Sequence, residues 1–373
     1  MLEIVKESEQ GVIIAPAGSG KTEMGMAVIA ELKQQALWLT HTKDLLEQSL
    51  TVAKKKLGLK EGEYGVIGGS SFAIGSHITF ATVQSLHKRK DLADIGKQMG
   101  VVVVDEAHRA AAGIKTMTMF ERVLSKMTAK YRIGLTASEH RADGLIKTVF
   151  LTIGDKIMEV EKESIDAYLI TPEICFVHTD YVFEYTRREG EFFPYSTMLS
   201  DMAVNEARNK LIVGYLCRNT AHHNLILGDS LEHLELLRKG LSDYVIRQTE
   251  FIHGGTPLNE RKAALSRIDS GQSRYLFATY ALAKEGLNLP ILDRLYLVTP
   301  KKDRVSVQQA LGRVSRVKSG KDGAIVYDFY DQHVDVCRKH ARARIKDVYK
   351  ILNCKIYGWQ SKTKNDLLVN LID

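Results

Sequence analysis

At 373 residues the chain is too long for one ordinary hydrophobic core and suits two domains of roughly 150 to 200 residues. Its 45% hydrophobic and 26% charged residues exclude a disordered or fibrous chain. The net charge of +7 is compatible with a polyanionic partner but is too small to identify one. The four cysteines lack the paired spacing of a zinc site or disulfide framework, and no apolar run reaches the roughly 18 residues of a membrane span. We therefore expect a soluble protein that is not exported.

The first 150 residues alternate short apolar runs with amphipathic stretches. The apolar runs predict strands at residues 11–15, 36–40, 77–82, 101–106 and 132–138. Stretches with helical periodicity separate the first three of them, at residues 24–33 and 44–57. Buried strands joined by helices are typical of a parallel sheet covered on both faces.

The second half repeats this architecture without a sequence repeat of fixed period. Strands are predicted within residues 170–183 and at 224–229, 250–255, 274–279, 294–300 and 324–331, with a helix at 231–241. Mixed charges at residues 151–165 predict a linker, and the basic amphipathic stretch 333–352 predicts a C-terminal helix. The expected fold class is α/β, with tandem domains at residues 1–155 and 156–331 and a basic helical extension at 332–373.

A phosphate-binding loop is predicted at residues 15–22, APAGSGKT, which follows an apolar strand and precedes a helix. Its glycines let backbone N–H groups converge on phosphate oxygens at the helix N-terminus. Lys21 is expected to reach the β- and γ-phosphates, and Thr22 to place its hydroxyl on Mg²⁺. Ala15 replaces the first glycine of the general pattern. The predicted nucleotide-contacting residues of this loop are Ala17, Gly18, Ser19, Gly20, Lys21 and Thr22.

The segment VVVVDEAH, residues 101–108, supplies two adjacent carboxylates at the end of a strand. Because neighbouring strand residues point in opposite directions, the two can take different roles. We expect Asp105 to hold Mg²⁺ and Glu106 to orient and deprotonate the attacking water. Alone, such an acidic pair is also common on protein surfaces, but here a phosphate loop precedes it.

Together these segments resemble superfamily 2 helicases. GSGKT, DEAH and GLTAS at residues 134–138 are similar to motifs I, II and III, and the segments at 39–48 and 81–86 to motifs Ia and Ib. In the second half, residues 225–237, 278–290 and 309–316 resemble motifs IV, V and VI. The wording is closest to phage and bacterial DEAD/DEAH-type helicases related to branched-DNA translocases and the type III restriction ATPase. The resemblance covers roughly residues 11–330 and implies two RecA-like domains.

The resemblance also implies roles for individual residues. Arg313 and Arg316 of motif VI would arrive from the second domain as arginine fingers on the triphosphate, which makes hydrolysis depend on closure of the two domains. Gln309 would sense the nucleotide, and Gly286 would let backbone approach it. His108, with Thr136 and Ser138, would couple the nucleotide state to the interdomain contact.

The chain departs from the family pattern at three places. Glu139 stands where motif III usually has a proline, and Asn288 where motif V often has an acid. Relatives usually carry a further segment before the phosphate loop, with a glutamine that reads adenine, but only ten residues precede Gly11. We therefore expect either a core without that segment or adenine recognition from elsewhere in the molecule.

A nucleic-acid strand is expected to cross both domains, held mainly through its phosphates. By motif position, the residues that face it are Thr42, Lys43, Thr82 and Gln84 in the first domain and Gly254, Thr256 and Thr279 in the second. Each is also of a type that is common in helix caps and turns. The basic residues at 338–350 are further candidates, although such a run is more often a solvated helix face.

The expected function is that of an ATP-dependent DNA helicase or translocase in repair, recombination or replication, acting on single-stranded or branched DNA. ATP and Mg²⁺ are the expected cofactors. The alternatives are an RNA helicase and a nucleotide-gated clamp with little turnover. We expect a monomer, without membrane contact, in the cytoplasm of a bacterium or of a phage-infected host.

Overall fold

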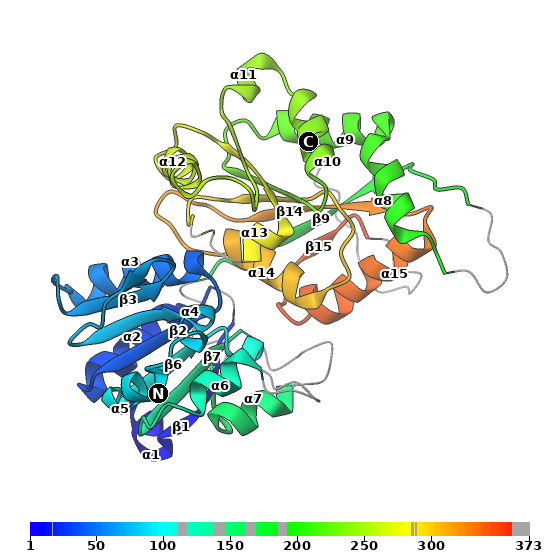
Figure 1. The fold of residues 1–373 in the computed structure, drawn as a ribbon. Helices are drawn as coiled ribbons and strands as arrows, with labels where there is room; N and C mark the ends of the chain where they lie inside the picture. The colour runs from blue at the N-terminus through cyan, green and yellow to red at the C-terminus, as the bar shows by residue number, and fades with distance from the viewer. Residues whose placement is uncertain are drawn as a thin grey trace. The chain divides into compact units, whose positions relative to one another are not determined.

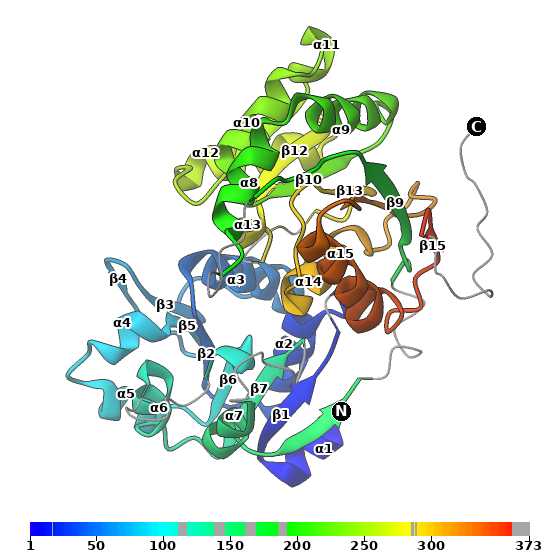
Figure 2. The same cartoon turned by 90° about the vertical axis from the view of Figure 1, so that its right-hand side faces the viewer.

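The computed structural model describes residues 1–359 apart from 17, 111–117, 138–145, 161–168, 186–191, 285, 286 and 288. The chain divides into two compact units, Met1–Ile165 and Asp166–Asp373. Each is an α/β domain with helices on both faces of one sheet (Figures 1 and 2), which confirms the expected fold class. Within the described ranges, no helix is both long and apolar enough to cross a membrane.

The first sheet has the strand order β4-β3-β5-β2-β6-β7-β1-β8 within the described part of the chain. The strands pair in parallel except β3 with β4. In the central strands β2, β5 and β6 every residue is buried, as expected for strands covered on both faces. The strands are β1 (Gln10–Ile14), β2 (Ala36–Thr40), β3 (Tyr64–Gly68), β4 (Ser71–Phe72), β5 (Ile78–Thr82), β6 (Val101–Asp105), β7 (Tyr131–Thr136) and β8 (Lys156–Glu159).

Helices cover the two faces of this sheet. Helices α2 (Lys21–Leu32) and α3 (Lys43–Leu57) pack against each other on one face, next to the short N-terminal helix α1 (Leu2–Ser8). On the other face, the core joins alternate strand residues to the 3₁₀ turn η1 (Ala107–Ala110) and to four helices. These helices are α4 (Val83–His87), α5 (Leu92–Gln98), α6 (Met119–Leu124) and α7 (Ile146–Ile153).

The prediction of a linker at residues 151–165 was wrong at 151–153 and 156–159, which lie in a helix and a strand. Helix α7 continues to Ile153, and β8 pairs with β1 as the edge strand of the first sheet. Residues 161–165 lie outside the described residues. The four residues of β8 are exposed or half-buried, so the strand tolerates the charges that led to the linker prediction. The division between the domains therefore falls after Ile165, later than the expected boundary after residue 155.

The second sheet is parallel in every pair of named strands within the described residues, with the order β11-β12-β10-β13-β14-β9-β15. Each apolar run predicted as a strand in this half forms one. The strands are β9 (Glu173–Thr179), β10 (Asn224–Gly228), β11 (Thr249–Ile252), β12 (Tyr275–Thr279), β13 (Arg294–Leu297), β14 (Ile325–Asp331) and β15 (Ile356–Tyr357).

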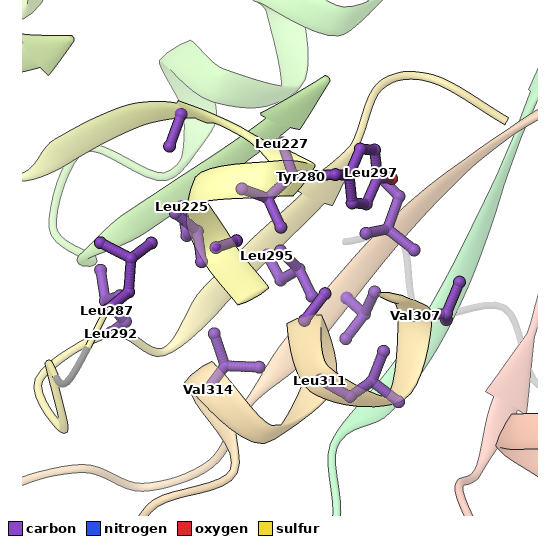
Figure 3. Packing of buried hydrophobic residues seen from close by; sticks show 14 of the residues in the cluster. Leu225, Leu227, Tyr280, Leu287, Leu292, Leu295, Leu297, Val307, Leu311 and Val314 are labelled. Carbon is purple, nitrogen blue, oxygen red and sulfur yellow. The ribbon is translucent and has the colours of Figure 1, made fainter. Parts of the chain in front are cut away.

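Two buried clusters cover the faces of the second sheet. One includes residues of α9 (Glu206–Arg218), α10 (Leu231–Lys239) and α11 (Asp243–Ile246), and α8 (Tyr195–Val204) packs on α9 and α10. The other involves α12 (Leu258–Asp269), α13 (Tyr280–Lys284) and α14 (Arg304–Val314). Figure 3 shows side chains of α13 and α14 packed on leucines of β10 and β13; labelled among them are Leu225, Leu227, Tyr280, Leu295, Leu297, Val307, Leu311 and Val314.

The C-terminal segment is built into the second domain through residue 359. Helix α15 (Asp335–Arg344) and the π turn η3 (Ile345–Tyr349) pack on the α14 side of the sheet, and β15 pairs with β9. Arg344 is only 2% exposed and forms a bidentate ion pair with Asp328 of β14. The helix was predicted, but this segment is a layer of the second domain, whereas a separate extension was expected. Residues 360–373 lie outside the described residues.

Candidate functional site

In the first domain, the functional motifs meet at the carboxyl edge of the sheet. Ile14, the last residue of β1, pairs with Thr136, the last residue of β7, and Asp105 at the end of β6 pairs with Leu135. The loop after β1, the DEAH segment after β6 and the end of β7 therefore start from neighbouring strands. Ligands of open parallel sheets bind at this edge.

The carbonyl groups of the loop after β1 contact the side chain of Lys21. Gly18 and Gly20 have φ of 88° and 81°, a region that L side chains rarely adopt, and Gly20 is the N-cap of α2. The Lys21 Nζ lies 3.4 and 3.5 Å from the Ala15 and Pro16 carbonyl oxygens, and such long contacts are readily exchanged for phosphate oxygens. The Ser19 Oγ is buried without a hydrogen-bond partner within the described residues.

Four of the predicted loop residues lie where the loop turns into α2. Ser19 and Gly20 end the turn, and Lys21 and Thr22 begin the helix. The first N–H groups of any helix have no intrahelical acceptor and point outward along its axis. This geometry fits an anion such as a triphosphate. The predicted contact Ala17 lies outside the described residues.

Asp105 is a buried carboxyl group at this edge. It is 5% exposed, and its Oδ1 accepts a hydrogen bond from the Glu106 N–H at 3.0 Å. Burial, with the neighbouring Glu106 charge, raises the pKa of Asp105 to about 7, while the Lys21 ammonium acts in the opposite direction. A hard divalent cation would favour the ionised form of such a carboxyl group.

Glu106 and His108 link the end of β6 to the end of β7. Glu106 has φ of 50°, which is unusual for a residue with a side chain and marks a local strain. The His108 Nδ1 lies 3.3 Å from the Glu106 Oε2 and 3.2 Å from the Thr136 Oγ1. His108 thus contacts both the DEAH segment and β7; its coupling role stays a prediction, and the predicted partner Ser138 lies outside the described residues.

The described residues contain no group of three or more His, Cys, Asp or Glu side chains that could hold a metal ion. Mg²⁺ does not require such a group, because it usually takes one or two protein oxygens and completes its octahedron with water and phosphate oxygens. Asp105 and the Thr22 hydroxyl are of the right chemistry for this. They remain the predicted Mg²⁺ ligands.

A groove of about 850 Å³ in the first domain brings predicted nucleic-acid contacts together. Lys43 of α3, Thr82 and Gln84 all line it, and the Gln84 Nε2 lies 3.4 Å from the His41 Nδ1. Thr42 instead caps α3, accepting a hydrogen bond from the Leu45 N–H. The full lining is His41, Lys43, Ile67, Gly69, Ser71, Thr82, Gln84, Ser85, Lys88, Arg89, Lys90 and Asp91.

Sequence reasoning missed the basic part of this groove, Lys88, Arg89 and Lys90. The signal was the run HKRKD directly after a recognised motif. Arg89 is held by Asp91 through two hydrogen bonds of 2.6 and 2.7 Å, and its guanidinium carbon lies 3.7 Å from the centroid of the Phe72 ring. Phe72 is 48% exposed, so the groove has a stacked aromatic and cationic pair at its edge.

In the second domain, the predicted nucleic-acid contacts Gly254 and Thr256 follow β11, and Thr279 ends the neighbouring strand β12. The Thr256 hydroxyl accepts a hydrogen bond from the His253 N–H, and the Thr279 hydroxyl accepts one from the Leu282 N–H at the start of α13. Both hydroxyls therefore already serve local turns. Gly254 is exposed, with no atom within 4 Å of a Cβ built on it.

Arg313 is bound to the motif V segment. Its Nε donates to the Ala283 carbonyl at 2.8 Å and its Nη1 to the Leu287 carbonyl at 2.7 Å. Gln309 is 8% exposed, and its Oε1 has no hydrogen-bond partner in the described part of the chain. Gly286 lies outside the described residues.

Arg316 is half-buried, and its backbone forms a bridge with Leu169. Lys21 belongs to the first unit, and Arg313 and Arg316 to the second. The composite site that we expect between the two units stays a prediction.

Comparisons with known proteins agree with this arrangement. Residues 1–141 match the family of the type III restriction enzyme res subunit, and residues 207–318 match the helicase conserved C-terminal domain.

Three curated relatives align over most of the chain. A putative ATP-dependent RNA helicase of Acanthamoeba polyphaga mimivirus is 25% identical, covering 92% of this chain and 64% of its own length. A probable helicase of Escherichia phage T5 is 26% identical, covering 88% and 69%. DNA 3'-5' helicase XPB of Kineococcus radiotolerans is 26% identical, covering 92% and 61%. The chain thus spans about two thirds or less of the length of these relatives.

Two solved structures share the fold. Saccharomyces cerevisiae Dbp5 bound to RNA and ADP BeF3 superposes with a TM-score of 0.61 at 14% identity, covering 92% of this chain and 88% of that one. A fragment of a putative HsdR subunit of a type I restriction enzyme from Vibrio vulnificus gives a TM-score of 0.65 at 15% identity, covering 91% and 63%. These likenesses support the tandem RecA-like core.

Proposed function

Because the chain belongs to the superfamily 2 helicases, with a res-type domain followed by a helicase C-terminal domain, we propose that it hydrolyses ATP to move along DNA. The observation that carries the proposal is the cluster at the carboxyl edge of the first sheet. There the Lys21 loop faces a buried Asp105, and His108 joins Glu106 to Thr136.

Each of these groups has a role in the proposed reaction. The loop at residues 15–22 binds the triphosphate, and Lys21 balances charge on its β- and γ-phosphates. Mg²⁺, when held by Asp105 and Thr22, neutralises charge on the phosphate oxygens. Glu106 orients the attacking water and accepts its proton. Arg313 and Arg316 would complete the site from the second domain with Gln309 as nucleotide sensor, and Gly286, outside the described residues, keeps the role that the resemblance implies.

The groove at Lys43, Thr82 and Gln84 supports a nucleic-acid strand as the track. Three further basic residues line it against one carboxylate, Asp91, which already pairs with Arg89. Contacts of this kind are sequence-independent, as stepping along a strand requires. The stacked Phe72 and Arg89 pair offers a surface for an unpaired base, which favours single-stranded or branched substrates over plain duplex.

DNA is the proposed substrate, on the strength of the relative named DNA 3'-5' helicase XPB. RNA is the second candidate, because the mimivirus relative is named as an RNA helicase. Remodelling of branched DNA in repair, recombination or replication is the expected setting. The direction from 3' to 5' is carried over from the XPB relative alone.

The test measures steady-state ATP hydrolysis with single-stranded DNA, blunt duplex, forked DNA and single-stranded RNA of equal length. We expect DNA with a single-stranded part to stimulate hydrolysis most, and forks to be unwound better than tailed duplexes. Greater stimulation by RNA would establish the second candidate. The proposal fails when no nucleic acid stimulates hydrolysis.

Glu106→Gln tests the chemistry within the same assay. Loss of a general base typically costs about 10² to 10⁴ in rate, so stimulated turnover should fall by that factor while ATP binding is kept. Glu61→Gln, at an exposed carboxylate of the same domain, is the control and should keep the parent rate. Unchanged turnover in Glu106→Gln would contradict the assigned role.

A further inference from the structure

Lys321 returns toward the end of α14 through a tight turn. The Lys321 N–H donates to the Lys318 carbonyl at 3.1 Å, and Gly320 within the turn has φ of 80°. A residue with a side chain would adopt that backbone conformation only with strain. The turn directs the lysine side chain back onto the segment that it has just left.

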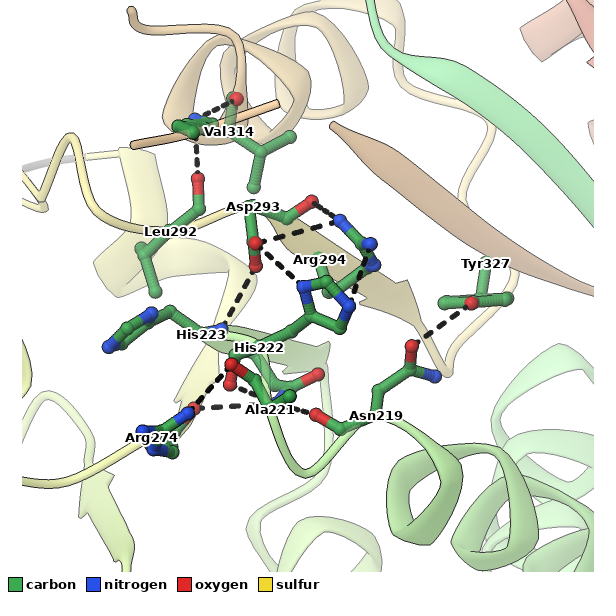
Figure 4. Close-up of polar contacts among 12 residues, drawn as sticks. Asn219, Ala221, His222, His223, Arg274, Leu292, Asp293, Arg294, Val314 and Tyr327 are labelled. Carbon is green, nitrogen blue, oxygen red and sulfur yellow. Dashed lines mark hydrogen bonds and ion pairs between the residues drawn. The ribbon is translucent and has the colours of Figure 1, made fainter. Parts of the chain in front are cut away.

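The Lys321 ammonium donates to main-chain carbonyls of two separate segments. Its Nζ lies 2.5 Å from the Val314 oxygen and 2.9 Å from the Arg316 oxygen, and 2.6 Å from the Leu292 oxygen, with a longer contact of 3.4 Å to Pro290. In Figure 4, dashed lines from the Leu292 and Val314 carbonyls meet at one nitrogen atom. The three short bonds use all three protons of the ammonium group.

These two segments carry the residues that we assign to catalysis from the second domain. Val314 and Arg316 lie in motif VI, and Leu292 follows motif V. Arg313 ties the same two segments in the opposite sense, from motif VI to the Ala283 and Leu287 carbonyls. The side chains of Arg313 and Lys321 therefore both link motif VI to motif V or to the segment directly after it.

Because Lys321 is partly buried, its ammonium needs all three of its carbonyl partners. Taking an ammonium out of water is costly unless its protons are fully hydrogen-bonded, so the three carbonyls must be in place together. Burial lowers the pKa of Lys321 to about 8, with Asp293 acting against this and Arg316, Arg294 and Lys318 acting with it.

We propose that Lys321 is a positioning residue for hydrolysis, whose ammonium holds motif VI against the segment after motif V so that Arg313 and Arg316 are preorganised for the triphosphate. The inference rests on the proposed function, because it assumes that these arginines act on the nucleotide. Lys321 itself has no contact with the reacting atoms in this assignment.

The variant Lys321→Met keeps most of the apolar stem and removes the ammonium. Misplacement of a catalytic group by about 1 Å can cost 10²-fold in rate, and we expect a loss in kcat of about that size. The KM for ATP should stay within about threefold, because the first domain supplies the phosphate loop. Lys318→Met is the matched control: this lysine of the same turn is 36% exposed and within the described residues forms its ion pair with Asp269, at 3.5 Å, so kcat should not change.

A double-variant cycle separates positioning from a general structural role. If Lys321 acts through Arg313 and Arg316, then adding Lys321→Met to the double variant Arg313→Ala with Arg316→Ala should not slow that double variant further. Multiplying losses, or a kcat of Lys321→Met equal to the parent value, would overturn the inference. If Lys321→Met does not fold, Lys321→Gln, which keeps an uncharged donor, takes its place, and its kcat should lie below the parent value.

The two proposals fail separately. A parent protein that no nucleic acid stimulates defeats the proposed function. Loss of turnover in Arg313→Ala and Arg316→Ala, together with normal turnover in a folded Lys321→Met or Lys321→Gln, defeats the positioning role alone.

Discussion

Asp105 in the first domain and Asp328 in the second are both buried aspartates on central strands, yet their surroundings differ. Asp328 is 1% exposed, receives two hydrogen bonds from Arg344 and accepts a third from the Tyr349 hydroxyl at 2.6 Å. Asp105 is 5% exposed and lies at the end of its strand, where burial and Glu106 raise its pKa to about 7.

The difference indicates that Asp328 has a structural role and that Asp105 is placed to bind a ligand. The Asp328 carboxylate is matched inside the domain by a guanidinium and a hydroxyl, so its site is complete without any ligand. Asp105 accepts hydrogen bonds from the Glu106 N–H and the Ser49 side chain but has no guanidinium partner within the described residues, so its site would gain stability from a cation brought by a nucleotide. The following variants test whether the two carboxylates differ in this way.

The largest effect on stability is expected from Arg344→Met. Removing one partner of a buried ion pair leaves an uncompensated charge and typically costs about 3 to 5 kcal/mol. Urea denaturation of the full chain should show this loss in the transition of the second domain. The double variant Arg344→Met with Asp328→Asn should recover much of it, and a parent-like stability of the single variant would show that the pair is not buried as described.

Asp105→Asn should have the opposite sign in the protein without nucleotide. The pKa of Asp105 is about 7 in the folded state against an ordinary value of 3.8, so its favourable contribution is complete below pH 3.8 and is lost as the pH rises through 7. At pH 8 the variant should be more stable than the parent by on the order of 3 kcal/mol. The advantage should shrink toward pH 4, and ATP hydrolysis should be lost. A destabilised variant at pH 8 would contradict the comparison.

A smaller effect is expected from His233 in the second domain. Burial, and then the Arg208 charge, lower the pKa of His233 to about 3, while its Nε2 lies 3.0 Å from the Asn209 Oδ1. Because the folded pKa lies below the unfolded value, the contribution is present above pH 6.5 and is lost as the pH falls. From pH 7 to pH 5 the second domain should lose about 2 kcal/mol. His233→Gln should show a shallower pH dependence, and an equal slope in both proteins would exclude His233 as its source.

Local patterns in the sequence predicted many of the strands. The run at residues 101–104 forms a fully buried strand because four β-branched residues suit a sheet covered on both faces. Strands β3, β4, β8 and β15 escaped prediction, since they are short or lie near sheet edges, where exposure weakens the apolar signal. The charges of β8 were taken for a linker for the same reason.

Part of the candidate site could likewise be predicted from the sequence, and part could not. Gly18, Gly20 and Lys21 were recognisable because a phosphate loop is a local object whose spacing and backbone conformation lie in eight consecutive residues. The basic lining of the groove and the role of Lys321 were not, although Lys88 and Arg89 stand beside a recognised motif. Nothing near Lys321 in the chain indicates that its ammonium meets the Leu292 carbonyl.

The sequence by itself determined the two α/β domains, the order of their motifs and the residues at strand ends that we expect to bind a nucleotide. These depend on periodicity and on spacing over a few residues, which survive without knowledge of neighbours in space. Only the tertiary structure decided which charges are satisfied inside the protein. Arg344 and Lys321 are basic residues in basic stretches, and what distinguishes them is a partner far along the chain, brought close by the packing of parallel strands and their helices.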